Sequence, residues 1–350
     1  MKAIVIKHFG IPDVFQEANL PIPSITEHQV LIRVAATSVN PVDTKIRQGL
    51  VADIAPDFPA VLHGDVAGVV EAVGDRVDRF KIGDEVYGCA GGVKGMGGAL
   101  AEYMSADANL IAHKPKSLTM VAAAALPLVS ITAWEGLIDR AKICSRQKVL
   151  VYGGTGGVGH LGIQLAKWAG AKVYATVSNE NKAKVARSLG ADVTINYQQH
   201  GDYRCSEAAS LSHPQTPVEK FVAEHTDGEG FEIVFDTVGN NNLQNAFQAA
   251  KLNGTVVSTV SLSSQDLTLL HAKGLTLHLV YMLIPMLSNL NRSYYGNILT
   301  KLADLVDRGQ VRPLIDSHSF TFDDVAAAHA HLESGAAIGK VVLSQSSIAS

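Results

Sequence analysis

A glycine-rich turn near the middle of the chain carries the clearest chemical signal. The apolar, β-branched run Val149 to Tyr152 leads into Gly154-x-Gly156-x-x-Gly159. In such a pattern the first glycine permits a tight turn, the second lets the backbone approach a pyrophosphate, and the third lets the following helix pack closely on the strand. The residues expected to contact a dinucleotide here are Gly154, Gly156, Gly157, Val158 and Gly159.

The residues after the turn complete a βαβ unit. His160 to Lys167 have helical periodicity, and Ala171 to Val177 read as a second strand. The N-terminal amides and dipole of such a helix favour a negatively charged pyrophosphate. A glycine-rich turn without a ligand is the alternative, but a complete unit favours a nicotinamide-dependent enzyme.

The end of the second strand bears on which coenzyme is bound. NAD-specific sites place an acidic residue about 20 residues beyond the glycines, where it accepts from the ribose hydroxyls. Ser178 stands at that position, and Lys182 follows one helical turn later. A serine removes the charge that would repel a 2′-phosphate, and a lysine can pair with that phosphate. The pattern predicts NADP(H), although Lys182 could simply be a solvated helix residue.

The elements that position these residues can be read from the alternation along the chain. Residues 1 to about 125 show short alternating runs between glycine, proline and aspartate turns, typical of an antiparallel β-rich domain. From Lys148 strands alternate with helices, which predicts a parallel, doubly wound sheet. The expected strands are Val149 to Tyr152, Lys172 to Val177, Val193 to Ile195, Ile233 to Asp236 and Thr255 to Val260.

We therefore expect an α/β protein with domains at 1–125 and 126–289, and a C-terminal return to the first domain at 290–350. Its 350 residues exceed what one hydrophobic core usually fills. The stretch Gly201 to Pro217 is rich in serine and turn formers and reads as a surface insertion, to which we assign no function.

Composition excludes several classes of partner. The formal net charge is −4, and we find no cluster of lysine and arginine, so neither nucleic acid nor an anionic membrane surface is an expected partner. The longest apolar run, Leu279 to Leu287, is too short to span a bilayer. Cys89, Cys144 and Cys205 lie far apart, without disulfide or CxxC spacing. We expect a cytoplasmic protein.

Five further motifs are distributed along the chain. They are Asn40-Pro-Val-Asp43-Thr, His63 to Gly74, Lys81 to Val86, Gly98 to Tyr103 and Leu126 to Trp134. Together with the glycine-rich turn they resemble the motifs of the medium-chain dehydrogenase/reductase superfamily. That resemblance implies a GroES-like catalytic domain with a Rossmann coenzyme domain inserted in it. Within the superfamily the chain is most similar to the zinc-independent quinone oxidoreductase branch, which includes zeta-crystallin.

The resemblance argues against a catalytic zinc. Zinc-dependent relatives hold the metal through a cysteine, a histidine beside an acidic residue, and a further cysteine. The corresponding positions are Asn40, Gly64 beside Asp65, and a position near Leu128. A catalytic zinc needs three protein ligands and an open position, and these residues do not provide them.

No other metal site is expected either. The four-cysteine lobe of zinc-dependent relatives is missing, since Cys89 is the only cysteine of the first domain. His63, Asp65 and Cys89 could form some other site, but a hydrogen-bonded loop histidine and a buried thiol are the better interpretation. The histidines of Ala328-His-Ala-His331 lack i, i+4 spacing and read as a partly exposed helix surface.

For the coenzyme, the resemblance implies contacts beyond the glycine turn. Lys182 and Tyr197 occupy positions that close around the 2′-phosphate, although Tyr197 could be only a strand-end aromatic. The segment Asp236-Thr-Val-Gly239 should line the adenosine and nicotinamide-ribose side, with the backbone of Val238 as the contact. Thr132 should lie near the nicotinamide.

Without a Lewis-acid metal, alcohol oxidation loses its usual stabilisation of an alkoxide, so reduction of an electrophilic acceptor fits better. We expect hydride transfer to a quinone or to the β-carbon of an enone, with catalysis by positioning and polarisation. Asn40 would contact the nicotinamide ribose or the acceptor oxygen, and Asp43 would orient it. Alternatively, Asn40-Pro-Val-Asp43 only caps a helix beginning at Val42.

No residue stands out as an obligatory general acid. Many relatives carry a tyrosine after an Arg-x-Gly-Leu turn, whereas Arg47-Gln-Gly-Leu50 is followed by Val51. Proton delivery from water is at least as plausible.

Two other functions stay open. One is an enoyl-thioester or 2-alkenal reductase, which shares the coenzyme and the hydride geometry. The other is a crystallin-like protein that holds the coenzyme with incidental turnover.

The apolar segment Leu275 to Leu287 resembles the edge through which relatives pair their coenzyme domains, so a homodimer is expected. The alternative is an intramolecular strand over the acceptor pocket.

Overall fold

The computed structural model describes residues 1–198 and 216–345, so most of the insertion expected at 201–217 lies outside the described residues. The chain divides into two compact units. Unit 1 comprises Met1–Ile131 and Met282–Ser350, and unit 2 comprises Thr132–Tyr281. The sequence placed these divisions near 125 and 289.

Unit 1 is built on a β-sheet of seven strands in the order β14-β15-β3-β4-β5-β7, with β6 paired to β3. Neighbours are antiparallel except β14 and β15. Its strands are β3 Gln29–Ser38, β4 Asp65–Val73, β5 Glu85–Cys89, β6 Tyr103–Asp107, β7 Ile111–His113, β14 Phe320–Thr321 and β15 Val342–Ser344, and a separate pair is β1 Lys2–Ile6 with β2 Phe15–Asn19.

The C-terminal part of the chain contributes to this unit, because β15 pairs with β3. The helices of unit 1 are α1 Pro41–Gln48, α2 Met120–Ala124, α9 Ile284–Ser288, α10 Ser293–Asp307 and α11 Val325–Glu333, and α3 Pro127–Trp134 runs across its boundary with unit 2. Helix α1 begins at Pro41, one residue before the start at Val42 that the sequence suggests, and is closed by Gly49 in the left-handed conformation (φ 80°).

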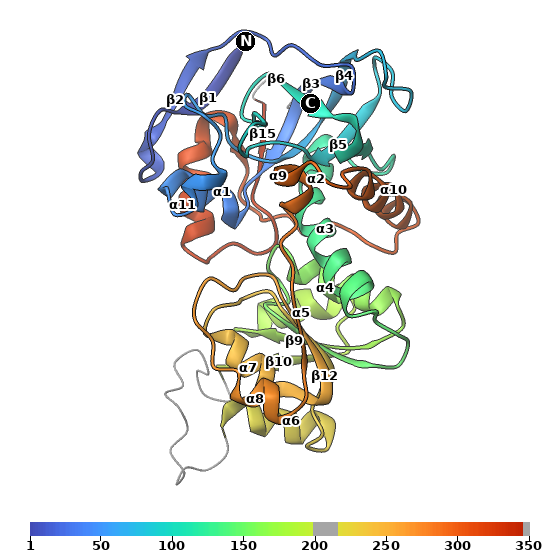
Figure 1. Cartoon of the computed structure of the whole chain (residues 1–350). Coiled ribbons are helices and arrows are strands. Elements are labelled where there is room, and N and C mark those ends of the chain that lie inside the picture. Colours follow the sequence, from blue (N-terminus) through green and yellow to red (C-terminus); the bar gives the residue numbers. More distant parts are fainter. Residues whose placement is uncertain (199–215, 346–350) are drawn as a thin grey trace. The chain divides into compact units, whose positions relative to one another are not determined.

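Unit 2 contains a sheet of six parallel strands in the order β10-β9-β8-β11-β12-β13. Figure 1 labels β9, β10 and β12 of this sheet. The chain runs from β8 outward to β10 on one side and then from β11 outward to β13 on the other, so the predicted doubly wound sheet is confirmed. The strands are β8 Lys148–Tyr152, β9 Lys172–Val177, β10 Val193–Asn196, β11 Phe231–Asp236, β12 Ala250–Ser258 and β13 Thr276–Leu279.

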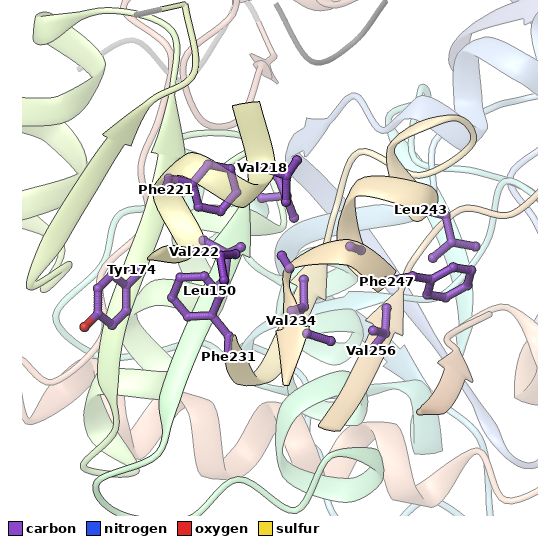
Figure 2. Close-up of a cluster of buried hydrophobic side chains, with 14 of the residues drawn as sticks. Leu150, Tyr174, Val218, Phe221, Val222, Phe231, Val234, Leu243, Phe247 and Val256 are labelled. Atoms are coloured by element: carbon purple, nitrogen blue, oxygen red, sulfur yellow. The ribbon is translucent and has the colours of Figure 1, made fainter. Parts of the chain in front are cut away.

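Helices connect these strands. They are α4 Gly159–Trp168, α5 Glu180–Ser188, α6 Pro217–Thr226, α7 Asn242–Ala249 and α8 Thr268–Ala272, of which the first four contain buried residues and α8 contains none. Figure 2 shows the cluster that results, in which Phe221 of α6 and Phe247 of α7 join Phe231 and Val234 of β11, all fully buried. Within the described residues, none of the helices is both long and apolar enough to cross a membrane.

The cluster predicts how unit 2 responds to a cavity. Phe247→Ala removes a fully buried ring and should lower the free energy of unfolding by about 3–5 kcal/mol. The matched control is Leu252→Ala, since Leu252 is 64% exposed and its truncation leaves no cavity. Both tryptophans, Trp134 and Trp168, lie in unit 2, so fluorescence during urea unfolding follows this unit. Equal shifts for the two variants would contradict the assignment of the core.

Candidate active site

The turn between β8 and α4 also contains Gly153, which directly precedes the three glycines of the fingerprint. The residue in the left-handed conformation is Gly153 (φ 70°), not Gly154. Its N–H donates to Oγ1 of Thr176 at 3.1 Å, and the N–H of Gly154 donates to the carbonyl of Thr176 at 3.2 Å. The turn is therefore fastened to β9, and the tight bend assigned to Gly154 belongs to Gly153.

The three fingerprint glycines differ in how closely other atoms surround them. A Cβ on Gly154 would lie 2.8 Å from the Cβ of Ala175, and one on Gly159 would lie 2.1 Å from the carbonyl oxygen of Gly153. Both glycines thus serve close packing. A Cβ on Gly156 would lie 3.2 Å from that same oxygen, a tight contact, and would have no other neighbour within 4 Å, so its remaining side is open. Gly157 and Val158 complete the turn before α4 begins.

This turn lies where a doubly wound sheet places its ligand. Strands β8 and β11 are neighbours whose following connections lead to opposite sides of the sheet, and ligands bind beside the carboxyl ends of such a pair. The two ends are joined directly, because Oγ1 of Thr237 donates to the carbonyl oxygen of Tyr152 at 2.6 Å.

Asp236, at the end of β11, organises the loop that follows it. Its buried carboxylate accepts from the backbone N–H groups of Val238 (3.1 Å) and Gly239 (3.0 Å), from Nδ2 of Asn242 (2.8 Å) and from Oγ of Ser258 (3.2 Å). Burial raises the pKa of this carboxyl, and the hydrogen bonds oppose that rise. Because the N–H of Val238 is taken, a coenzyme contact there is left to its carbonyl oxygen and its 47% exposed side chain.

Ser178, Lys182 and Tyr197 share one edge of unit 2. Ser178 follows β9, and the N–H of Tyr197, just after β10, donates to the carbonyl of Val177 at 3.2 Å. Oδ1 of Asn179 caps α5 by accepting the N–H of Lys182 at 2.9 Å. Tyr197 also packs against the hydrophobic cluster, so it has a structural role in addition to any ligand contact. Thr132 is buried in α3, at the first residue of unit 2.

In unit 1, Asn40 and Asp43 belong to a buried polar network. Nδ2 of Asn40 donates to Oδ2 of Asp65 at 2.8 Å, and Oδ1 of Asn40 accepts from Nζ of Lys340. The N–H of Asn40 donates to Oδ2 of Asp43 at 2.7 Å, the reciprocal bond of a capping box. Asn40 thus stands at the N-cap of α1, where the capping bond comes from Asp43, while its own side-chain amide is held by Asp65 and Lys340.

Asp65 is the centre of this network. Its carboxylate accepts from Oγ of Ser38 (2.7 Å) and from the N–H of Leu128 (2.8 Å), and Nζ of Lys340 lies 3.5 Å away. Burial lowers the pKa of Lys340, with Asp65 and Asp43 opposing that effect. Burial also raises the pKa of Asp43 to about 7, so this carboxyl can hold or release a proton near neutral pH.

Lys340 was missed in the sequence because nothing near it suggests a site. It lies 300 residues from Asn40, in the short segment before β15. A lysine next to the last strand is normally expected to be exposed to solvent. Here it is buried, and its Nζ also donates to the carbonyl of Val39 at 3.0 Å.

The geometry does not fit a catalytic zinc. At the second aligned position, a Cβ on Gly64 would lie 2.9 Å from the carbonyl oxygen of Gly91 and 3.1 Å from Sγ of Cys89, so a ligating side chain has no room. At the third, Leu128 offers only a backbone N–H. The ammonium of Lys340 already stands against the carboxylate of Asp65, where a metal ion would meet a like charge.

His63 is a hydrogen-bonded histidine and Cys89 is a buried thiol, as the sequence predicts. His329, predicted on a partly exposed helix surface, is buried instead. Nε2 of His63 lies 2.9 Å from Nε2 of His329, and the two rings stack at 5.2 Å. Burial lowers the pKa of both imidazoles, that of His329 to about 3. Burial raises the pKa of the Cys89 thiol. The prediction of an exposed helix surface was wrong for His329, because that face of α11 packs on α1 and against Phe15.

Two family models match separate parts of the chain. Residues 26–116 match the alcohol dehydrogenase GroES-like domain, and residues 189–343 match a model described as zinc-binding dehydrogenase. The second description names zinc, but the residues at the aligned ligand positions in this chain are those given above.

Curated relatives match along nearly the whole chain. The 2-methylene-furan-3-one reductase of Solanum lycopersicum is 37% identical over 98% of this chain and 79% of its own length. The chloroplastic NADPH-dependent alkenal/one oxidoreductase of Arabidopsis thaliana is 36% identical with the same coverage. The quinone oxidoreductase of Lama guanicoe is 31% identical over 98% of this chain and 97% of its own length.

Solved structures agree with these relatives. An alcohol dehydrogenase superfamily protein from Novosphingobium aromaticivorans is 37% identical, with a TM-score of 0.89 over 98% of this chain and 99% of that one. The Escherichia coli quinone oxidoreductase complexed with NADPH is 25% identical, with a TM-score of 0.83 over 98% of this chain and 100% of that one. The chain is therefore an oxidoreductase of the medium-chain dehydrogenase/reductase superfamily and belongs to its quinone oxidoreductase branch.

Proposed function

We propose that this protein is an NADPH-dependent, zinc-independent reductase of α,β-unsaturated carbonyl compounds or quinones. The observation that carries the proposal is the buried network of Asn40, Asp65 and Lys340. In this network Asn40 occupies one of the aligned zinc-ligand positions, and Asp65 follows Gly64 at another. A site without a Lewis acid suits an acceptor that is already electrophilic.

The described residues suit NADPH in three places. The open side of Gly156 and the N–H groups leading into α4 would hold the pyrophosphate. Ser178, Lys182 and Tyr197 would surround the 2′-phosphate. Val238 and Thr132 would contact the nicotinamide portion. When bound, the reduced nicotinamide supplies the hydride.

The relatives' names favour a conjugated acceptor. A 2-methylene-furan-3-one reductase and an alkenal/one oxidoreductase are both named for compounds in which a carbon–carbon double bond is conjugated to a carbonyl. Accepting a hydride at the β-carbon places negative charge on the carbonyl oxygen. Asn40 has a second Nδ2 hydrogen that can donate to that oxygen, while its other amide atoms are held by Asp65 and Lys340.

The same geometry supports two further expectations. Strand β13 is a sheet edge, with Leu279 51% exposed and Tyr281 49% exposed after it, which supports a homodimer through the coenzyme units. A cytoplasmic location remains part of the proposal, since the exposed Cys144 and buried Cys89 are free thiols.

The first prediction concerns the acceptor. Steady-state oxidation of NADPH should proceed with short enones, 2-alkenals or small quinones and not with saturated ketones, because only a conjugated acceptor stabilises the charge left after hydride addition. Absorbance at the NADPH band measures the rate. Turnover of none of these acceptors would favour a coenzyme-holding role, and preferential turnover of an enoyl thioester would move the assignment to that class.

The second prediction concerns the 2′-phosphate. Lys182→Ala should weaken NADPH binding by roughly 1.5–3 kcal/mol, the value of a charge-assisted hydrogen bond, and leave NADH binding nearly unchanged. Lys184→Ala, an exposed lysine of the same helix, is the matched control. Fluorescence titration with both coenzymes measures the affinities. Equal losses for NADPH and NADH, or equal effects of the two variants, would refute the phosphate contact.

The third prediction separates catalysis by Asn40 from its structural role. Asn40→Ala should lower kcat by about 10²-fold or more, because it removes a donor to the charge that develops on the acceptor. Ser38→Ala removes another donor to the same Oδ2 of Asp65 and should change kcat little. Thermal unfolding of both variants measures the structural cost. Equal losses of kcat would assign Asn40 to the network alone.

A further inference from the structure

Unit 1 contains a second cluster of ionisable side chains, apart from the Asn40 network. It consists of Asp316 and His318, in the segment between α10 and β14, and His331 in the last turn of α11. One potential ligand atom from each residue lies within 4.8 Å of the other two. Among the described residues, it is the one group of at least three histidine, cysteine, aspartate or glutamate side chains whose ligand atoms lie close enough to hold a metal ion.

The carboxylate of Asp316 is held in place before any ligand arrives. Its Oδ1 accepts the backbone N–H of His318 at 3.0 Å, and its Oδ2 accepts the backbone N–H of Ile338 at 2.8 Å. The side chain is almost fully buried. The cluster therefore offers a fixed, negatively charged oxygen.

Two imidazole nitrogens converge on that oxygen. Nδ1 of His318 lies 2.7 Å from Oδ1 of Asp316, and Nε2 of His331 lies 3.1 Å from the same atom. The rings of His318 and His331 are 4.3 Å apart, and Phe320 packs against both. The arrangement brings two nitrogen donors and one oxygen donor to one point from two separate segments of the chain.

Two of the three separations in the cluster are close to those around a bound metal ion, and the two imidazole nitrogens lie within 4.8 Å of each other. With metal–ligand distances of about 2.0–2.1 Å, ligand atoms of a tetrahedral zinc ion stand about 3.3 Å apart. The present separations of 2.7 and 3.1 Å are slightly shorter. The side chain of His318 is 61% exposed and can move outward, whereas His331 is only 15% exposed and is held by its packing.

We propose that Asp316, His318 and His331 form a binding site for a divalent transition-metal ion, with Zn²⁺ as the best fit. Two imidazoles and one carboxylate favour zinc, cobalt, nickel or copper over magnesium or calcium, which prefer all-oxygen sites. The exposed side, where His318 lies, leaves the fourth position to water. This site is separate from the aligned zinc-ligand positions, and it does not depend on the proposed reductase activity.

A metal ion bound here would link two segments in the C-terminal part of unit 1. The N–H of Asp316 donates to the carbonyl of Lys340 at 2.9 Å, and Ile315 forms an isolated bridge with Lys340. The ion would tie this segment to α11 through His331. We therefore expect it to act structurally, by raising the thermal stability of unit 1.

The test measures zinc binding directly on tag-free protein, stripped with a chelator and dialysed against ZnCl₂. Cys144→Ser and Cys205→Ser are introduced throughout, so that thiols do not compete for the metal. The protein should retain one equivalent of zinc by elemental analysis, with an increase in melting temperature. Cobalt should replace zinc and give the intense visible absorption of a low-coordinate site with nitrogen ligands.

His318→Ala and His331→Ala should each weaken zinc binding by at least about tenfold and abolish the increase in melting temperature. The matched control is His28→Ala, since the side chain of His28 is 58% exposed and lies outside the cluster. Because His331 is partly buried, His318→Ala decides the matter if His331→Ala does not fold. Less than one equivalent of zinc in the parent protein, or binding unchanged in His318→Ala, would overturn the proposal and leave a hydrogen-bonded cluster.

Discussion

Unit 2 depends on the close approach of α4 to the turn that precedes it. A Cβ on Gly159 would fall 2.1 Å from the carbonyl oxygen of Gly153, so only glycine allows the helix to begin so near the end of β8. That approach directs the N–H groups of the first helical turn toward the carboxyl edge of the sheet. The order of the strands then places Asp236 and its loop beside the same edge.

The main constraint in unit 1 is the burial of charged groups. The carboxylate of Asp65 and the ammonium of Lys340 are both removed from water, and such a pair is tolerated only when its remaining polar atoms are satisfied. Ser38, Asn40, the N–H of Leu128 and the carbonyl of Val39 provide those partners. The cation of the network is thus supplied by the chain itself, and the amide of Asn40 is held in one orientation as a consequence.

The sequence predicted those parts of the molecule whose determinants are local. The βαβ unit, the alternation of strands and helices in unit 2 and the start of α1, predicted at Val42 and found at Pro41, all depend on neighbouring residues. Gly153 was misjudged because the fingerprint counts glycines without assigning their backbone angles, and only the structure shows which one adopts a positive φ. Lys340, His329 and the cluster at Asp316 could not be found in this way. Apart from His318, which is two residues from Asp316, their partners lie between 15 and 301 residues away, and burial of a lysine or a histidine leaves no local pattern.

The most direct test of the central claim is hydrogen exchange, followed by mass spectrometry, with and without NADPH. If the coenzyme docks at the carboxyl ends of β8 and β11, NADPH should slow exchange in Gly153 to Gly159, in Ser178 to Lys182 and in Thr237 to Gly239. NADH should protect the first and third of these segments and leave the second nearly unchanged. Protection confined to other parts of the chain, or none at saturating NADPH, would contradict the account.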